Sequence, residues 1–260
     1  MLKEERFAKI IEYLKINNTA KLNELAEVTG VSVDTVRRDL ETLEQYGVLN
    51  RVRGGAVWRR ESLEQHVYEM RTTVHSEEKK KIASLIENVL EDGKTVVMGS
   101  SSTTVEIARH IAHNYKRLMV ITNDNDIAKI LSENDKIKIV HLGGVLDPEE
   151  NATYGKLCEE ELLQYNADVC ILSVNGISVE KGLSDFRLNQ IDTFRRMMEI
   201  SEKTVVAVDS SKFKKSSSMI VCDIDSIDCI ISDSGLDEAI IDKLRQKNID
   251  VITGREESEA

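Results

Sequence analysis

Short apolar runs alternate with helical patterns through most of the chain, and this alternation restricts the fold more than any other feature. Six runs occur between residues 95 and 232: TVVM, LMVIT, KIVHL, DVCILSV, TVVAV and DCIIS. Helical stretches such as 76–91 and 103–113 lie before and between them. Strands that alternate with helices form a largely parallel sheet covered on both faces. We therefore predict an α/β domain over residues 76–254.

The beginning of the chain follows a different pattern, in which apolar residues recur at helical spacing. This spacing predicts helices over residues 3–16 and 21–28, and Gly30 permits a turn between the second helix and a third. Ser32 is a suitable N-cap for the third helix. Helices in this order, with a short turn before the last, predict a helix-turn-helix.

The segment that follows, GVLNRVRGGAVW, predicts two short strands joined around Gly54-Gly55. Such a hairpin is the wing of a winged helix-turn-helix domain, which we assign to residues 1–58. Residues 59–75 are polar and mixed in charge. We expect them to form a linker between this domain and the α/β domain.

The predicted third helix has an apolar stripe and an exposed face. The stripe consists of Val33, Val36, Leu40 and Leu43. The opposite face carries Asp34, Thr35 and Arg38, and Arg37 lies on its flank. In a DNA major groove, Arg38 and Thr35 would reach base edges while Arg37 would reach a phosphate. The helix also allows a plainer interpretation, in which Arg37 pairs with Glu41 and Arg38 is solvated.

The distribution of charge favours a nucleic-acid interface near the N-terminus. Residues 1–60 hold 11 Lys and Arg against nine Asp and Glu, which is a net charge of +2. Because the whole chain has a net charge of −11, residues 61–260 carry −13. The segment 51–60 holds four arginines and no acid. Contacts with a polyanion concentrate in such a basic segment. The candidate DNA-binding residues are Ser32, Asp34, Thr35, Arg37, Arg38, Arg51 and Arg53.

Several other classes of protein are disfavoured. No apolar run approaches the roughly 18 residues of a membrane span, and the charged start MLKEERFAKI is unlike a signal peptide, so we expect a cytoplasmic protein. The four cysteines form no CxxC pair, and we expect buried core residues instead of a disulfide scaffold or zinc site. Neither a GxxxxGK[ST] loop nor a GxGxxG fingerprint is present, so nucleotide hydrolysis and dinucleotide binding lack their usual sequence support.

Polar residues at the ends of the predicted strands mark a candidate ligand site, because functional residues of parallel sheets gather at the carboxyl edge. Gly99–Thr104 (GSSSTT) follow the first predicted strand and lead into a helix. They offer backbone N–H groups, hydroxyls and the positive end of a helix to an anion such as phosphate. The competing interpretation is structural, because serine and threonine also cap helices.

Other predicted strand ends repeat this pattern with Asn123, Gly143-Gly144, Asn175-Gly176 and Asp209–Phe213 (DSSKF). They could converge on one crevice with Lys212 as its cation, although each alone also fits an ordinary turn. His110 and His113 lie three residues apart, but no second ligand pair accompanies them. We therefore predict no metal site.

These motifs resemble the DeoR family of bacterial transcription regulators. The stretch ELAEVTGVSVDTVRRDLETLEQYGVLNRVRGGA is similar to the winged helix-turn-helix signature of that family. The order GSSSTT, VITN, HLGG, NGI, GLS and DSSKF is similar to its sensor domain, whose fold resembles ribose-5-phosphate isomerase. The resemblance implies a regulator, most often a repressor, that binds double-stranded operator DNA and responds to a phosphorylated sugar or related metabolite.

The same resemblance implies roles for individual residues of the sensor domain. Those that would hold the phosphate are Ser102, Thr103, Thr104 and Lys212, and those that would line the pocket are Asn123, Gly143, Gly144 and Asn175. With the remaining loop hydroxyls, the candidate ligand-binding residues are Ser100, Ser101, Ser102, Thr103, Thr104, Asn123, Gly143, Gly144, Asn175 and Lys212.

The chain departs from the family pattern within this set. Gly99, Asn175 and Ser178 stand where the family usually has acids, and Phe194 stands where it often has lysine. Isomerisation through an enediol requires a general base, usually a carboxylate, and neither Asn175 nor Ser178 can serve. We therefore expect no catalytic residue and no cofactor, and keep a sugar-phosphate isomerase-like enzyme as one alternative. A second alternative is a DNA-binding protein whose α/β domain only oligomerises.

We also expect the chain to assemble with copies of itself. One winged helix buries too little surface for tight selection of an operator, whereas a symmetric pair can span two half-sites. The expected assembly is a homodimer or a homotetramer.

Overall fold

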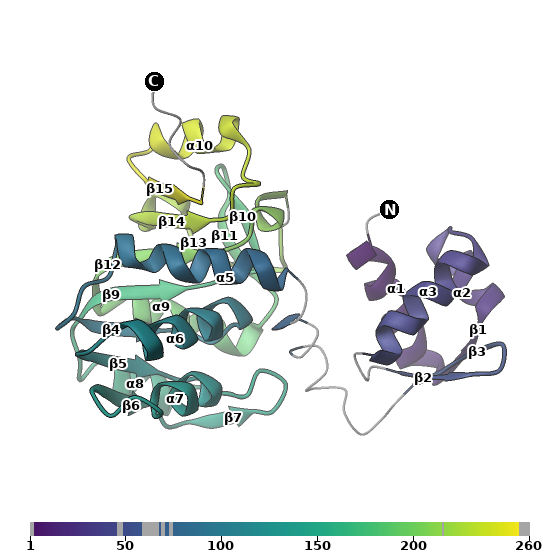
Figure 1. Cartoon of the computed structure of the whole chain (residues 1–260), viewed down its shortest axis with the longest axis horizontal. Coiled ribbons are helices and arrows are strands. Elements are labelled where there is room, and N and C mark those ends of the chain that lie inside the picture. Colours follow the sequence, from purple (N-terminus) through teal and green to yellow (C-terminus); the bar gives the residue numbers. More distant parts are fainter. Residues whose placement is uncertain are drawn as a thin grey trace. The chain divides into compact units, whose positions relative to one another are not determined.

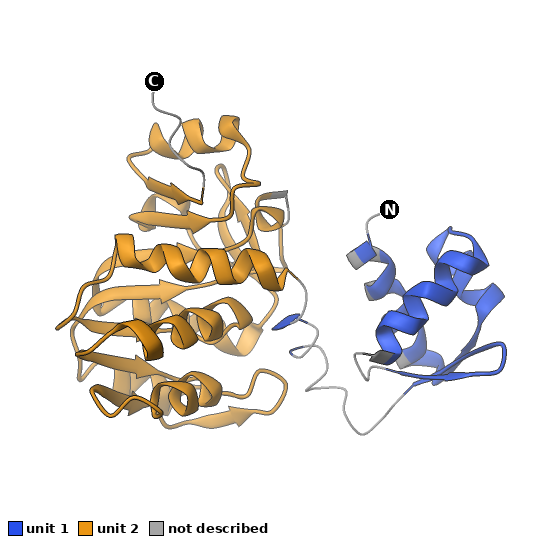
Figure 2. Ribbon diagram, viewed as in Figure 1, with its two compact units in different colours: residues 1–73 blue, residues 74–260 orange. Residues whose placement is uncertain are grey.

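The structure, a computed structural model, describes residues 3–45, 49–58, 68, 71–72, 75–214 and 216–254. The chain divides into two compact units, Met1–Thr73 and Val74–Ala260 (Figure 2). Each unit has its own hydrophobic core. Most of the predicted linker, 59–75, lies outside the described residues.

Three helices of the first unit follow the predicted pattern closely (Figure 1). They are α1 (Lys3–Asn17), α2 (Leu22–Thr29) and α3 (Val33–Gln45). Gly30 ends α2 with a φ of 69°, a left-handed conformation that glycine adopts without strain. On α3, Val36, Leu40 and Leu43 are buried, as their stripe predicted, and they share one core with α1 and α2.

A small antiparallel sheet completes the winged helix-turn-helix. Its strands are β1 (Thr19–Lys21), β2 (Leu49–Val52) and β3 (Gly55–Trp58), in the order β1-β3-β2. The β2-β3 hairpin confirms the predicted wing, whereas β1 was not predicted. A Cβ atom at Gly55 would lie 2.0 Å from the carbonyl oxygen of Ala20, so only glycine permits β1 and β3 to pair here.

A parallel sheet of seven strands organises the second unit (Figure 1). In sheet order the strands are β15 (Asp250–Thr253), β14 (Cys229–Ser232), β12 (Ser201–Ala207), β9 (Ala167–Leu172), β4 (Thr95–Met98), β5 (Leu118–Thr122) and β6 (Ile137–His141). The six predicted runs coincide with or overlap strands of this sheet, and β15 is an addition. The predicted α/β fold class is therefore confirmed.

The chain builds this sheet in two directions from β4. It first adds β5 and β6 on one side and then returns to add β9, β12, β14 and β15 on the other. A topological switch point therefore lies between β4 and β9. Ligands of open α/β sheets bind outside the carboxyl ends of the strands at such a point.

Helices cover both faces of the sheet (Figure 1). On one face α5 (Ser76–Ser84) packs against α6 (Ser102–Asn114), which packs against α7 (Asn125–Leu131). On the other face, α8 (Lys156–Leu162), α9 (Ile191–Glu199) and α10 (Glu238–Arg245) contribute to one hydrophobic core. Among the residues that the structure describes, no helix is long and apolar enough to cross a membrane.

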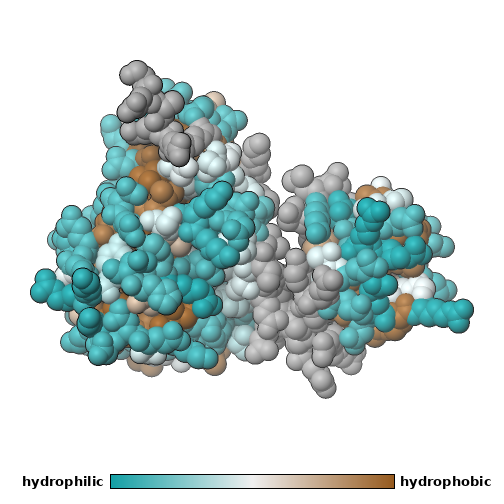
Figure 3. Space-filling view, viewed as in Figure 1, coloured by the Kyte–Doolittle hydropathy of each residue, from teal (hydrophilic) through white to brown (hydrophobic). Residues whose placement is uncertain are grey.

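Short elements that the sequence analysis missed are added to this layered core. The strand pairs are antiparallel and comprise β7 (Val145–Asp147) with β8 (Ala152–Tyr154), and β10 (Gly176–Ser178) with β11 (Gly182–Asp185) and β13 (Met219–Cys222). Single 3₁₀ turns are η2 (Leu85–Asn88), η3 (Leu188–Gln190), η4 (Ser210–Lys214) and η5 (Ile224–Ser226). Outside the grey residues, the face in view is mostly hydrophilic (Figure 3).

The four cysteines are free thiols. Cys158, Cys170 and Cys229 are buried, as predicted, whereas Cys222 is half-buried. Burial raises the pKa of each of these four thiols. All four thiols are therefore protonated near neutral pH.

Candidate functional site

Two of the predicted DNA-binding arginines are exposed on α3 and the wing. Arg38 lies on the outer face of α3, and Arg53 lies in the turn between β2 and β3. Within the described part of the chain, neither guanidinium makes a hydrogen bond or an ion pair. Both charges are therefore available to an external anion.

The start of α3 is held by its own hydroxyl groups. The Ser32 Oγ accepts the Thr35 backbone N–H at 3.3 Å and lies 2.9 Å from the Thr35 hydroxyl. This is the N-cap that the sequence predicted. These contacts stabilise the first turn of α3, which is the end of the helix that would enter a DNA groove.

The other two arginines have carboxylate partners. Arg37 pairs with Asp34 at 2.9 Å, and about half of the Arg37 side chain is exposed. Arg51 pairs with Glu41 at 2.9 Å, and its backbone N–H donates to Glu44 at 2.7 Å. The alternative pairing of Arg37 with Glu41 was therefore wrong. The structure directs Arg51 toward α3, which leaves Arg53 as the unpaired arginine among the described residues of the wing.

A buried ion pair that the sequence did not indicate joins α1 to α3. The Arg6 guanidinium donates to both carboxylate oxygens of Asp39, at 2.7 and 3.0 Å, and the Asp39 side chain is 4% exposed. Two parallel hydrogen bonds fix the relative orientation of the groups they join. This pair therefore sets the angle at which α1 supports α3.

In the second unit, three adjacent strands bring together three candidate ligand-binding positions. The strands β12, β9 and β4 are neighbours, and their carboxyl ends lead to Lys212, Asn175 and Ser100 respectively. The Lys212 Nζ lies 3.4 Å from the Asn175 Oδ1. Lys212 and Asn175 are therefore in contact, and Ser100 lies at the end of the neighbouring strand β4. Their convergence on one crevice stays a prediction.

Positive charge collects beside this point around the buried carboxyl of Asp209. Burial alone would raise the pKa of Asp209, yet its surroundings lower it. The causes are the charge of Lys212, a hydrogen bond from the Ser211 hydroxyl, and the charges of His75 and Lys79. Two lysines, Lys79 and Lys212, therefore act on this carboxylate, and their charges are of the sign that an anionic ligand needs.

The hydroxyl loop, Gly99–Thr104, follows β4 and carries two kinds of hydroxyl group. Some of them make structural hydrogen bonds, and others have no partner among the described residues. Ser101 caps α6 by accepting the Thr104 N–H at 3.0 Å, and the Thr104 hydroxyl donates to the Gly99 carbonyl at 2.7 Å. The structural interpretation therefore applies to Ser101 and Thr104. The hydroxyls of Ser100, Ser102 and Thr103 have no hydrogen-bond partner among the described residues.

Asn123 and the glycine pair occupy different surroundings. Asn123 follows β5, is fully buried, and donates to the Thr153 carbonyl at 2.6 Å. Gly143 follows β6, two strands from β4, and its N–H donates to Glu161 of α8 at 2.8 Å. Gly144 lies against the backbone of Tyr154 in β8. The structure thus places Asn123 near the hydroxyl loop and both glycines farther along the sheet edge.

A buried arginine, Arg187, spans the switch point, although the sequence analysis did not select it. Its guanidinium donates to the Ser100 carbonyl at 2.5 Å and to the Ser173 carbonyl at 3.0 Å, so it joins the ends of β4 and β9. It also pairs with Asp185 at 2.6 Å and with Glu150 at 3.6 Å. Asp185 is only two residues from Arg187 in the sequence. The other partners of Arg187, namely Glu150 and the ends of β4 and β9, are distant in the chain, so no local sequence pattern could indicate them.

An aromatic ring explains the glycine at the start of the hydroxyl loop. A Cβ atom at Gly99 would lie 2.6 Å from the Leu172 side chain and 3.0 Å from the Phe194 ring. The Arg187 guanidinium lies 5.1 Å from the centroid of that ring. The space for a side chain at position 99 is therefore filled by Leu172 and Phe194. Two of the departures from the family pattern, Gly99 and Phe194, belong to one packing arrangement.

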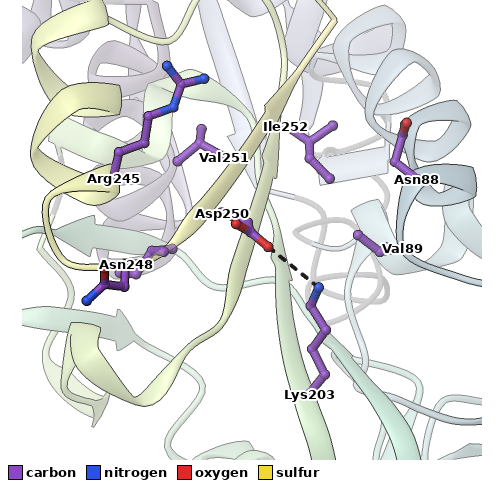
Figure 4. Close-up of a pocket in the computed structure, with 9 residues that line it drawn as sticks. Asn88, Val89, Lys203, Arg245, Asn248, Asp250, Val251 and Ile252 are labelled. Atoms are coloured by element: carbon purple, nitrogen blue, oxygen red, sulfur yellow. Dashed lines mark ion pairs between the residues drawn. The ribbon is translucent and has the colours of Figure 1, made fainter.

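A separate pocket of about 540 Å³ lies along the edge strand β15 (Figure 4). It is lined by residues of η2, β12, α10 and β15, with Lys203 paired to Asp250 at 3.8 Å. No candidate residue from the sequence lines it.

His110 contacts Glu87 at 2.7 Å, and the described residues contain no group of acids, histidines or cysteines arranged to hold a metal ion.

Family models and curated relatives agree on one family. Residues 6–62 match the model of the DeoR-like helix-turn-helix domain, and residues 74–234 match the DeoR C-terminal sensor domain. The chain is 31% identical to the HTH-type transcriptional repressor GlcR of Bacillus subtilis, over 97% of this chain and 96% of that protein. It is 32% identical to the transcriptional repressor AccR of Agrobacterium fabrum, over 94% and 96%.

Two further similarities are more distant. The glycerol-3-phosphate regulon repressor of Escherichia coli is 28% identical over 90% of this chain and 92% of that protein. Ribose 5-phosphate isomerase A from Methanocaldococcus jannaschii is similar with a TM-score of 0.40 and 15% identity, over 54% of this chain and 55% of that one.

Proposed function

Because the chain belongs to the DeoR family of transcriptional regulators, we propose that it is a repressor whose affinity for operator DNA is modulated by a phosphorylated sugar or a related anionic metabolite. The observation that carries this proposal is that the chain has both an exposed arginine face on α3 and a cationic strand-end site in the sensor domain. Such a protein acts in the cytoplasm, where operator DNA is accessible.

The exposed face of α3 supports DNA binding through a division of roles. Arg38 has no partner within the described chain, and a free guanidinium can bond two atoms of a guanine edge in the major groove. Arg53 on the wing can contact a phosphate beside that groove. Asp34 holds Arg37 on the flank of α3, where it too can meet a phosphate.

The strand-end site supports an anionic metabolite. Lys212 reaches Asn175, the charges of His75 and Lys79 act on the same Asp209, and the hydroxyls of Ser102 and Thr103 begin α6. A helix N-terminus with hydroxyls and cations beside it favours a phosphate group. The names of several relatives refer to repression, and one refers to a glycerol-3-phosphate regulon.

We do not assign catalysis to this site. Isomerisation through an enediol requires a carboxylate that is free to accept a carbon-bound proton. The carboxylates near Asn175 are already paired: Asp185 with Arg187, and Asp209 with its surrounding cations. Ser178, which stands where the family usually has an acid, bonds Glu180 at 2.9 Å. We expect purified protein to turn over no pentose or hexose phosphate.

We further propose that the repressor is a homodimer or a homotetramer. Specific protein–DNA interfaces exceed the surface of a single winged helix, and paired modules read two half-sites. Sedimentation at micromolar concentration, with and without DNA, measures the assembly. A monomer under both conditions would exclude this part of the proposal.

Selection of DNA by the full chain tests the regulatory function. Duplexes are selected from a random library, and the affinities for the selected duplex and a scrambled duplex are measured at several salt concentrations. We expect the selected duplex to bind at least about 10³-fold tighter, with log K falling linearly as log salt rises. Equal affinity for the two duplexes would contradict operator recognition.

A further inference from the structure

Large apolar side chains are exposed at several places on the described part of the second unit. They belong to Val145, Leu146, Leu157, Leu163, Phe186, Leu188, Met219 and Ile220. The last four are 39 to 61% exposed and come from the end of β11, from η3 and from β13. We call these four residues the β13 patch. Half of the exposed large apolar side chains described in this unit therefore lie on one surface.

The residues of the β13 patch come from segments that adjoin in space. Asp185 of β11 lies opposite Met219 of β13, so Phe186, the next residue, lies beside the start of β13. Leu188 begins η3, which leads directly into α9, and α9 packs against β13. The patch therefore continues from β11 across β13 to α9, on the face of the sheet opposite α5, α6 and α7 (Figure 1).

The charged groups beside the patch neutralise each other. The Arg195 guanidinium donates to the carbonyls of Ile220 and Val221, at 2.8 and 2.9 Å. It also donates to the Asp192 carboxylate at 3.1 Å. One cation and one anion are thus fixed next to the exposed apolar side chains. The surface has no surplus of acid, although residues 61–260 together carry a net charge of −13.

A hollow of about 360 Å³ adjoins the patch. Its lining includes Arg195, Met198 and Cys222, and Cys222 is the last residue of β13. Met198 and Cys222 are partly buried and pack against the hydrophobic core. One surface therefore carries both exposed apolar side chains and a hollow with an apolar part that can receive such a side chain.

This combination fits a second copy of the same chain. Two molecules that each carry a charge of −11 repel each other, so a contact between them has to avoid surplus acids, and the patch does so. In a two-fold contact the same surface of each copy faces the other. The exposed apolar side chains of one copy can then pack into the hollow of its partner, and the reverse.

The size of the patch also fits such a contact. Its four residues expose roughly 350 Å², if one large side chain presents about 200 Å² when fully exposed. Apolar patches of a few hundred Å² mark interaction sites on soluble proteins. A stable dimer buries about 800 Å² on each partner, as an apolar core with a polar rim. The patch can supply the core, and Asp192 and Arg195, which are 71 and 49% exposed, can supply part of the rim.

We propose that two copies of the chain associate through the β13 patch, so that the apolar side chains of each copy pack against the same surface of the other. This inference rests on the homo-oligomer put forward under the proposed function, and it adds the surface through which the copies meet. No local pattern in the sequence indicates the patch, because its residues come from two separate segments.

Sedimentation velocity of the full chain at micromolar concentration tests the contact. Leu188→Glu and Ile220→Glu each place a carboxylate inside it, one from η3 and one from β13. Both side chains are exposed in the single chain, so the variants should keep the fold, which circular dichroism checks. Each variant should raise the dissociation constant of the assembly about 100-fold or more, because association would bury an unpaired charge. A dimer would then sediment as a monomer, and a tetramer as a dimer.

Leu157→Glu provides a matched control, because it makes the same change on α8 at a leucine that is 64% exposed, against 61% for Leu188. This variant should sediment like the parent. Dissociation by Leu157→Glu and by neither patch variant would place the contact on α8 and overturn the inference. An oligomeric parent whose mass survives both patch variants would overturn it too, while the proposed homo-oligomer would stand. A monomeric parent, with and without DNA, would remove the homo-oligomer and this contact together.

Discussion

At the scale of single residues, Arg38 and Arg53 are both exposed, and neither guanidinium has a partner among the described residues. Their removal should nevertheless change DNA binding in different ways. Arg38→Ala should reduce the preference for operator over scrambled DNA by about 1 to 3 kcal/mol, because a base contact is lost. Arg53→Ala should weaken both duplexes alike and lower the salt slope by about one unit, because a phosphate contact is lost. Filter binding across a salt series measures both quantities. If both variants kept the affinities and the salt slope of the parent, neither α3 nor the wing would contact DNA as proposed.

Asp124 makes a second residue-scale prediction, on stability. Its carboxylate caps α7 through the N–H groups of Asp126 and Ile127, at 2.8 and 2.9 Å, yet burial raises its pKa from 3.8 to about 7. The folded state therefore binds more protons than the unfolded state between these values. Stability contributed by the protonated form is complete below pH 4 and is lost as the pH rises toward 7 and above.

Asp124→Asn should remove this loss, because asparagine caps a helix equally well and does not titrate. Between pH 4 and 7, the free energy of unfolding of the second unit should fall less steeply in the variant than in the parent, by roughly 1 to 4 kcal/mol over the whole range. Urea unfolding followed by circular dichroism reports on both units, and the fluorescence of the single tryptophan, Trp58, identifies the part of the transition that belongs to the first unit. Parallel pH profiles for the two proteins would show that Asp124 stays ionised in the folded state.

At the scale of elements, Arg51 acts as a clamp between the wing and α3. Its contacts with Glu41 and Glu44 hold the β2-β3 hairpin against the helix that carries Arg38. Arg51→Gln should therefore leave the salt slope of DNA binding at the parental value, in contrast to Arg53→Gln, which should lower it by about one unit. The same salt series measures both variants. A salt slope lower by one unit in Arg51→Gln would show instead that Arg51 contacts a DNA phosphate.

The elements that could be predicted from the sequence are those with a long, regular apolar pattern. The spacing in α1 and α3 and the runs of β5 and β9 are of this kind. The missed strands are short, and β7 carries exposed Val145 and Leu146, so its pattern did not differ from that of a loop. Such strands form because another segment presents a backbone to them, which no local pattern records.

The candidate site was predictable to a similar extent. Lys212 and Asn175 follow strands whose order the fold class constrains, and they meet as expected. Arg187 could not be chosen, because it depends on partners far away in the chain. Gly99 illustrates the same limit, since the side chains that require a glycine there, Leu172 and Phe194, come from β9 and α9.

At the scale of the whole molecule, regulation requires the two units to be coupled. A metabolite can change operator affinity only if it binds the DNA-competent and incompetent arrangements with different affinity. Coupling is typically about 1 to 3 kcal/mol, or roughly a 5- to 150-fold change in DNA affinity. In an oligomer, the spacing of paired winged helices is the property that such coupling would alter.

Titration of labelled operator with the parent protein and with Lys212→Ala, each with and without a bound phosphate ester, tests the central claim most directly. The account predicts that the ester changes the operator affinity of the parent about 5- to 150-fold. Lys212→Ala should bind operator like the parent without ester and lose most of this response, because Lys212 is proposed to contact ligand and not DNA. An undiminished response in Lys212→Ala, or a parent that binds the ester without any change in operator affinity, would contradict the account.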